Sequence, residues 1–260
     1  MSIYYMGCEN LEKLNVLFAN WDETLIWSCL QGYMGTAWAD NTTHPKSGQI
    51  VIADFCFFAG EANTSFVKNK PLSHKSDFVI MVPQNEEWAK LIEAEYGANA
   101  TKVTRYAIKK EPNVFCAEKL KAFTDAVNQD YDIRLIDEKI FEATRANRWS
   151  VDLCSQFESY DEYLEKGLGV AALHNGELVC GASSYTVYHD GIEIEIDTRE
   201  DYRRKGLALA CGAKLILECI ARNLYPSWDA QNKGSVALAE KLGYHFDKEY
   251  IAYEISGYGT

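Results

Sequence analysis

Residues 192–208 read IEIEIDTREDYRRKGLA, and they combine a basic cluster with a glycine at the expected start of a helix. The cluster is Arg203, Arg204 and Lys205, and Gly206 follows it directly. The first N–H groups of a helix have no partner within the helix, and they carry the positive end of its dipole. The chain as a whole has a net charge of −12, so the local basic cluster needs a local reason. We therefore predict an anion-binding site at this helix start.

The strand before this helix is expected to have one acidic face. Its residues alternate strictly, so the isoleucines share one side while Glu193, Glu195 and Asp197 share the other. The isoleucine face should pack under a helix, which turns the carboxylates towards a cleft. These side chains could accept a proton, bind a cationic substrate or simply face solvent.

Bulk composition is typical of a globular protein with one large domain or two small ones. The chain has 260 residues, of which 47% are hydrophobic and 25% charged. The net charge of −12 argues against nucleic-acid or anionic-membrane partners and slightly favours a cationic substrate. Solubility alone is the simpler explanation of this charge.

The cysteines, histidines and apolar runs predict a cytoplasmic protein without a membrane span or a metal site. The 8 cysteines form no CxxC pair and no signal peptide precedes them, so reduced, mostly buried thiols in a cytoplasmic protein are expected. No apolar run approaches the roughly 20 residues of a membrane span. The 5 histidines show no HExxH or other ligand spacing, so we expect no metal site.

The second half of the chain shows an alternation of strands and helices around this segment. The Asn175-Gly176 pair between two apolar runs predicts a hairpin, because both turn residues must adopt positive φ. The expected order is a strand at 131–137, mostly helix at 146–168, the hairpin at 169–187, the acidic strand at 192–198, a helix at 206–223, a strand at 224–230, a helix at 233–243 and a last strand or strands at 244–255. The fold class is therefore α/β (α+β).

We place a domain boundary near 125–130, giving an N-terminal α/β domain at 1–127 and a catalytic domain at 128–260. The first domain contains no glycine-rich phosphate loop and no motif that indicates chemistry. Its order of strand, strand, helix and strand is compatible with a degenerate copy of the second domain. An unrelated cap domain is the alternative.

The pattern R-x-x-G-x-A at 203–208, followed by Asn232, Ser235 and AEKLGY at 239–244, resembles the acyl-CoA-binding core of the GNAT N-acetyltransferase superfamily. The resemblance covers roughly residues 130–255. The segments WDAQN and SSY look closest to the branch that includes aminopolyol-antibiotic resistance acetyltransferases. The resemblance implies a mixed, mostly antiparallel sheet flanked by helices, a possible GNAT-like origin for the N-terminal domain, and acetyl-CoA as the co-substrate.

The resemblance also implies which residues hold acetyl-CoA. The loop and helix start would bind the pyrophosphate, the end of the preceding strand would pair with the pantetheine arm, and an asparagine would orient the coenzyme. The residues at these positions are Ile196, Asp197, Thr198, Arg203, Arg204, Lys205, Gly206, Leu207, Ala208 and Asn232. Gly206 fits because a backbone without a Cβ can approach a phosphate closely.

Catalytic residues are less clear from the same comparison. Family members often carry a glutamate on this strand as base or water relay, and Glu193 fits best, with Glu195 second. Many members use a tyrosine to protonate the leaving thiolate, but Ala239 stands at that position. Ser235 is a candidate for this acid, although capping a helix is an equal alternative for it, and Tyr244 or a water could also serve.

The expected function is transfer of an acetyl group from acetyl-CoA to a primary amine of a small, cationic molecule. A non-enzymatic acyl-CoA sensor or interaction protein, and a protein amine acetyltransferase, are the alternatives. We expect no nucleic-acid or membrane partner, and the sequence leaves a homodimer open.

Overall fold

The computed structural model describes residues 2–259, which form two compact units. Of the described residues, the first unit contains 2–105 and 249–259, and the second contains 106–248. The sequence boundary at 127/128 differs from this division for two reasons. Helix α5 (Ala117–Asp125) packs on α8 (Leu207–Ala221) of the second unit, and the end of strand β13 (Phe246–Ser256) pairs with β5 (Phe78–Pro83) of the first.

The first unit is built on a sheet whose central strands are highly apolar. Its strands are β1 (Tyr4–Met6), β2 (Thr36–Ala39), β3 (Ser47–Ile52), β4 (Phe55–Gly60), β5 and most of β6 (Ala100–Ile108), whose last three residues belong to the second unit. Its helices are η1 (Cys8–Leu14), α1 (Asn15–Phe18), α2 (Thr24–Leu30), α3 (Thr64–Lys68), α4 (Glu86–Tyr96) and η2 (Gly97–Asn99). Strands β2, β3 and β4 pair antiparallel, whereas β4 and β5 pair parallel. Trp88, stacked on Phe58, lies at the centre of the core.

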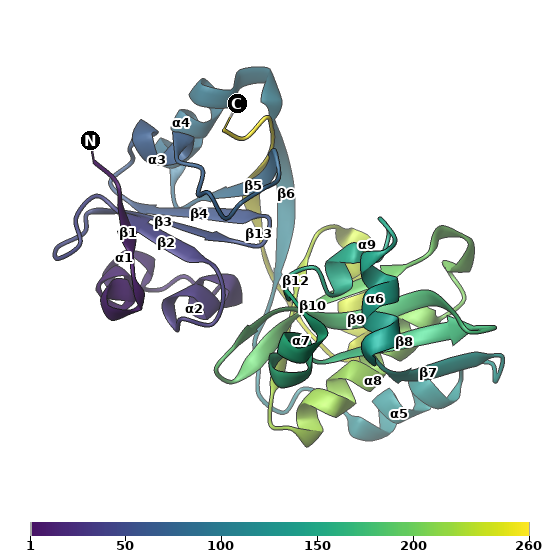
Figure 1. The fold of residues 1–260 in the computed structure, drawn as a ribbon. Helices are drawn as coiled ribbons and strands as arrows, with labels where there is room; N and C mark the ends of the chain where they lie inside the picture. The colour runs from purple at the N-terminus through teal and green to yellow at the C-terminus, as the bar shows by residue number, and fades with distance from the viewer. Residues whose placement is uncertain (1, 260) are drawn as a thin grey trace. The chain divides into compact units, whose positions relative to one another are not determined.

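The second unit repeats this arrangement (Figure 1). Its strands are β7 (Tyr131–Leu135), β8 (Gly169–His174), β9 (Glu177–Tyr188), β10 (Gly191–Thr198), β11 (Tyr225–Ser227) and β12 (Asp229–Ala230). Its helices besides α5 and α8 are α6 (Glu138–Arg145), η3 (Val151–Leu153), α7 (Tyr160–Lys166), η4 (Glu200–Tyr202) and α9 (Lys233–Leu242). Strands β7 to β10 pair antiparallel and β10 pairs parallel to β11. The predicted class, a mixed and mostly antiparallel sheet with helices, is confirmed.

The two halves of the chain have the same order of elements, an order compatible with a degenerate copy, which is one of the two alternatives for the N-terminal domain. In each, a strand and helices precede an antiparallel three-stranded meander. Each meander is followed by a helix, a parallel strand, a second helix and a final strand. The final strands β6 and β13 are neighbours in the larger sheet, whose order is β1-β2-β3-β4-β5-β13-β6-β12.

Candidate functional site

Strands β10 and β11 separate part of the way along their length. They pair in parallel only from Gly191 to Glu193 on β10, whereas β9 accompanies β10 as far as Thr198. Within residues 2–259, no strand pairs with the other edge of β10 beyond Glu193. The chain after β11 continues into β12, which pairs with β6. A fork therefore opens between β10 and the chain that follows β11.

A bulge lies at the point where the fork opens. Glu193 pairs with Thr186, but the next residue, Ile194, pairs with Ser184, so β9 carries one extra residue there. Such bulges bend a strand, increase its twist and often occur next to active sites. The bulge accompanies the divergence of β10 from β11.

Side chains meet the backbone along the open edge of β10. The Ile196 N–H donates to Glu195 Oε1 at 3.2 Å, and the Thr198 carbonyl accepts from Arg203 Nε at 3.4 Å. Buried or half-buried backbone groups need hydrogen-bond partners, and here adjacent side chains supply them. A ligand with amide groups could take both positions if these side chains moved aside.

The start of α8 has the geometry that an anion requires. Gly206 adopts φ 83°, and among residues 2–259 no side chain caps this helix. The position of a Cβ on Gly206 has no neighbouring heavy atom within 4 Å, so the space before the first turn is open. Arg204 also adopts a positive φ of 63°, so positive φ occurs at two positions of the loop, Arg204 and Gly206. Successive N–H groups in such a loop form a concave anion site.

The three cations of this loop have different surroundings. The side chain of Arg203 lies against the Thr198 carbonyl, and Lys205 Nζ lies 4.2 Å from the centre of the Tyr202 ring. Arg204 is exposed and makes no hydrogen bond or ion pair with other residues in the range 2–259. Arg204 is therefore the side chain most readily available to a bound anion.

The two faces of β10 are as the alternation predicts. A Cβ on Gly212 of α8 would lie 3.1 Å from Ile196 Cδ1, so the isoleucine face packs on α8. On the opposite face, Leu153 of η3 lies over Gly181, which is the cross-strand partner of Asp197. Asp152, next to Leu153, acts electrostatically on Asp197. The acidic face thus lies towards η3, and Asp152 joins it, a residue that sequence reasoning missed.

Burial and the nearby Asp152 raise the pKa of Asp197 to about 6, and Arg203 opposes this. The folded protein therefore binds this proton more tightly than the unfolded chain does, so stability falls as pH rises from about 4 to about 6. A shift of this size corresponds to about 3 kcal/mol, and to about 1–2 kcal/mol after allowance for the partial exposure of Asp197.

We expect Asp197→Asn to be more stable than the wild type by about 1–2 kcal/mol at pH 8, because the variant removes the desolvated charge. The difference should vanish near pH 3.5, where the wild-type carboxyl is also neutral. Urea unfolding at several pH values measures both quantities. A difference that does not change with pH would contradict this account.

Glu193 lies where the fork opens. It is 4% exposed, and its partners in register are Thr186 on β9 and Ser227 on β11. Tyr188, whose hydroxyl lies 2.8 Å from Ser227 Oγ, has its pKa raised by burial and further by Glu193. Glu195 is half-buried and lies further along the open edge.

The remaining predicted residues lie around α9. Asn232 is the N-cap of this helix, since its Oδ1 accepts from the Ser235 N–H at 3.0 Å. Ser235 is therefore not the capping residue, and it is half-buried in the first turn. Tyr244 is 2% exposed and donates to the Pro226 carbonyl at 2.6 Å, and burial raises its pKa well above the usual value. Tyr244 is thus held in the interior by this hydrogen bond, and Ser235 stays a candidate for the acid.

The first unit lacks both parts of this arrangement. Strands β4 and β5 pair from Phe55 to Phe58, and the Gln84 N–H continues by donating to the Phe58 carbonyl at 3.1 Å. The helix that follows β4, α3, has Asn63 as its N-cap, and the Asn63 side chain accepts from the Ser65 N–H. A closed pair of strands and an occupied helix start leave the second unit with the candidate site.

Other classes of site find little support in residues 2–259. No group of three or more His, Cys, Asp or Glu residues there could hold a metal ion, and no helix there is long and apolar enough to cross a membrane. All eight cysteines are free, and only Cys8 and Cys116 are exposed. Burial raises the pKa of thiols such as Cys219 to about 12, which keeps them protonated.

Comparison with known proteins agrees with this geometry. The profile of one family, described as GNAT acetyltransferase, matches residues 15–253 and so includes the first unit. A protein of Bacillus subtilis named "Uncharacterized N-acetyltransferase YdfB" is 27% identical over 241 residues, which are 88% of this chain and 89% of that protein. These matches extend well beyond the 130–255 region that carries the sequence motifs.

Solved structures show the same arrangement. A GCN5-related N-acetyltransferase-like protein from Streptococcus suis is 43% identical, covers 95% of this chain and 98% of its own, and superposes with a TM-score of 0.89. A tandem GNAT protein from the clavulanic acid biosynthesis pathway covers 98% of both chains with a TM-score of 0.58 at 9% identity. The second likeness concerns the fold alone.

Proposed function

Because the chain belongs to the GNAT acetyltransferase family and is an N-acetyltransferase, we propose that it transfers the acetyl group of acetyl-CoA to a primary amine of a small, cationic molecule. The fork beside β10, with the uncapped start of α8 at its end, is the observation that carries this proposal. The open edge of β10 could hydrogen-bond amide groups of a ligand, and the loop that follows this strand could bind its phosphates.

The residues at the fork fit an acyl-CoA molecule. The loop at 203–208 would hold the pyrophosphate through its N–H groups, with Arg204 adding charge. The backbone at 196–198 would hydrogen-bond the pantetheine amides, in place of the contacts from Glu195 and Arg203. When bound, acetyl-CoA supplies an acetyl thioester.

The acidic face supports a cationic acceptor. Glu195 and Asp197 on β10 and Asp152 on η3 place carboxyl groups on the side of the sheet opposite α8. A positively charged molecule would be attracted to this side and oriented by it. The sequence branch that acetylates aminopolyol antibiotics is one source of acceptors to test.

Glu193 is proposed to take the proton from the attacking amine. The amine must be neutral to attack the thioester carbonyl, so it must lose a proton before or during the attack. Glu193 is 4% exposed, and we propose that a water carries the proton to its carboxylate. When the C–S bond breaks, the thiolate takes a proton from a water, either directly or through the Ser235 hydroxyl, which gives up its proton and takes one back from that water. An amide and a free thiol result.

Calorimetry with acetyl-CoA tests the first part of the proposal. We expect micromolar binding to the wild-type protein and a loss of affinity in Arg204→Ala, because Arg204 supplies a free charge at the loop. A release assay for free thiol, run across mono-, di- and polyamines and aminopolyol antibiotics, tests the second part. No binding at high micromolar acetyl-CoA would contradict the coenzyme assignment, and release with neutral amines alone would contradict the cationic acceptor.

Ala239 stands where many family members have a tyrosine that protonates the thiolate. This difference favours a second candidate function, an acyl-CoA sensor without turnover. Ala239 is fully buried in α9, so its position supplies no acid for the thiolate. Binding of acetyl-CoA without thiol release from any amine, including peptide N-termini and lysines, would support the sensor. Release with peptides alone would instead support a protein acetyltransferase.

A further inference from the structure

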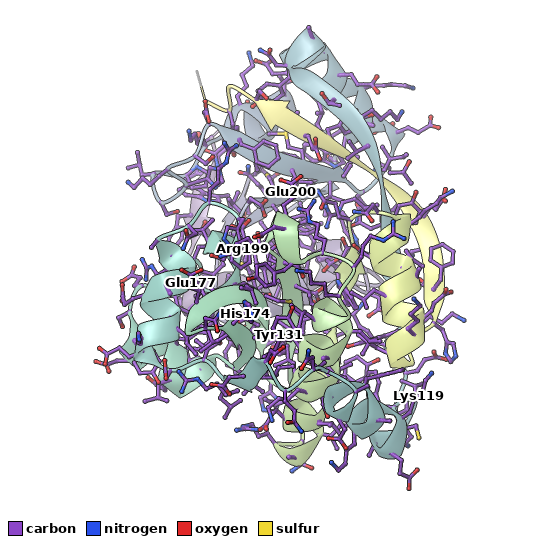
Figure 2. All side chains as sticks on the ribbon, turned by 90° about the vertical axis from the view of Figure 1, so that its right-hand side faces the viewer. Lys119, Tyr131, His174, Glu177, Arg199 and Glu200 are labelled. Carbon is purple, nitrogen blue, oxygen red and sulfur yellow. The ribbon has the colours of Figure 1, made fainter. Side chains whose placement is uncertain are left out.

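A cluster of aromatic and charged side chains lies directly before the phosphate loop and contains residues that no step above uses. Its centre is Tyr202 in η4, and its other members come from β7, β8 and β9, from η4 and the residue before it, and from the loop. Figure 2 shows Tyr131, His174, Glu177 and Arg199 on one side of the second unit. The members are Tyr131, His174, Glu177, Arg199, Asp201, Tyr202 and Lys205, and we call them the Tyr202 cluster.

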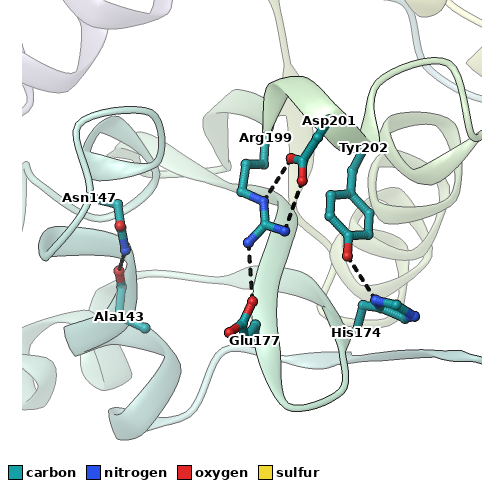
Figure 3. Close-up of polar contacts among 7 residues, drawn as sticks. All are labelled: Ala143, Asn147, His174, Glu177, Arg199, Asp201 and Tyr202. Atoms are coloured by element: carbon teal, nitrogen blue, oxygen red, sulfur yellow. Dashed lines mark hydrogen bonds and ion pairs between the residues drawn. The ribbon is translucent and has the colours of Figure 1, made fainter.

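Tyr202 joins the phosphate loop to the sheet. Its hydroxyl lies 2.8 Å from Nδ1 of His174, the last residue of β8 (Figure 3). The ring of Tyr131 meets it edge-on with 6.2 Å between centroids. A hydrogen bond between η4 and β8, an inner strand of the sheet, restricts the loop that begins at the next residue.

The Tyr202 ring also contacts two cationic side chains, one before η4 in the sequence and one after it. The guanidinium of Arg199 lies 4.5 Å from its centre and the ammonium of Lys205 lies 4.2 Å from it, both within the range of cation–π attraction. Arg199 is also held by Glu177 at 3.3 Å and Asp201 at 2.8 Å (Figure 3). Arg199 is therefore neutralised and fixed, and Lys205 is directed to the ring.

The loop next to Tyr202 contains a backbone conformation that costs free energy. Arg204 and Gly206 both adopt positive φ, and for a residue with a side chain this conformation is unfavourable. Tyr202 contacts Arg199 before the loop and Lys205 within it, so it is placed to stabilise this conformation.

We propose that Tyr202 and His174 are positioning residues that hold the phosphate loop in its anion-binding form before the coenzyme arrives. This rests on the proposed acetyl-CoA site. A loop ordered in advance loses less conformational freedom on binding, so the affinity for the coenzyme is higher. Neither residue touches the reacting atoms.

The test compares Tyr202→Phe, His174→Ala and the double variant with the wild type. We expect each single variant to weaken coenzyme A binding about three- to tenfold in calorimetry, which is the worth of one hydrogen bond. The double variant should bind coenzyme A with about the affinity of whichever single variant binds it less tightly, because both substitutions remove the same hydrogen bond. In kinetics, KM for acetyl-CoA should rise by the same factor while kcat at saturation stays unchanged.

Two further variants separate positioning from general stability. His174→Asn keeps an acceptor near Nδ1 and should restore most of the affinity. Tyr96→Phe removes a comparable hydrogen bond, to the Val67 carbonyl at 2.9 Å in the first unit, and should leave binding unchanged at a similar cost in melting temperature. Wild-type affinity in Tyr202→Phe and His174→Ala, or equal losses in Tyr96→Phe, would overturn the positioning role. Failure of the wild type to bind coenzyme A would instead overturn the proposed function.

Discussion

Gly206→Ala should weaken acetyl-CoA binding by about a hundredfold, since it would place a methyl group in the open space before the first turn of α8. A phosphate bound there accepts charge-assisted hydrogen bonds worth about 1.5–3 kcal/mol each. Losing one or two of them costs about 3 kcal/mol, which is roughly two powers of ten in the dissociation constant. Calorimetry with acetyl-CoA measures this loss.

Gly176→Ala is the matched control. Gly176 adopts φ 81°, close to the 83° of Gly206, and a Cβ on it also meets no heavy atom within 4 Å. Both variants pay the same backbone penalty of about 1–2 kcal/mol in stability. Only Gly206→Ala should lose the coenzyme, because Gly176 lies in the turn between β8 and β9. If the two variants bound acetyl-CoA with equal affinity, the assignment of the pyrophosphate to this helix start would be contradicted.

Local signals explain why this part of the site was predictable. The Asn175-Gly176 turn is observed with φ of 53° and 81°, as its sequence requires. The glycine start of α8 and the Asn232 start of α9 are likewise specified within a few residues. Such features depend on conformations that neighbouring residues alone favour or forbid.

The fork is different, because it depends on strand pairing across the unit. The segment 224–230 reads as one strand, but the structure divides it into β11, paired with β10, and β12, paired with β6. The extra residue in β9 beside Glu193 also has no mark in the sequence. The electrostatic effect of Asp152 on Asp197 and the hydrogen bond between Tyr202 and His174 also link residues far apart in the chain.

The expectation of helix over 146–168 was largely wrong. The structure has only the short η3 and α7 there. Polar side chains end α6 and compete for its carbonyl groups: Asn147 Nδ2 donates to the Ala143 carbonyl at 3.0 Å (Figure 3), and Ser150 Oγ donates to the Thr144 carbonyl at 2.9 Å. The irregular segment then brings Leu153 onto Gly181 and Asp152 to the acidic face.

We expect Glu193→Gln to lower kcat by about a hundredfold or more while leaving acetyl-CoA affinity unchanged. General base catalysis is worth about 10²–10⁴-fold, and an amide of the same shape cannot accept the proton. Glu193 lies where β10 is still paired with β11, whereas Glu195 lies on the open edge and accepts from the Ile196 N–H there. The thiol-release assay at saturating acetyl-CoA gives kcat, and calorimetry gives the affinity.

Glu195→Gln is the control, because it changes the same charge two residues further along the strand. We expect it to alter kcat by less than about fivefold, well below the contribution of a general base. The loss in Glu193→Gln should also shrink as pH rises, since an amine with a pKa near 10 gains about tenfold in its neutral form with each pH unit. A loss that is independent of pH would argue against proton removal. A larger loss in Glu195→Gln would move the base to Glu195, whose half-buried carboxylate would then act at the amine directly.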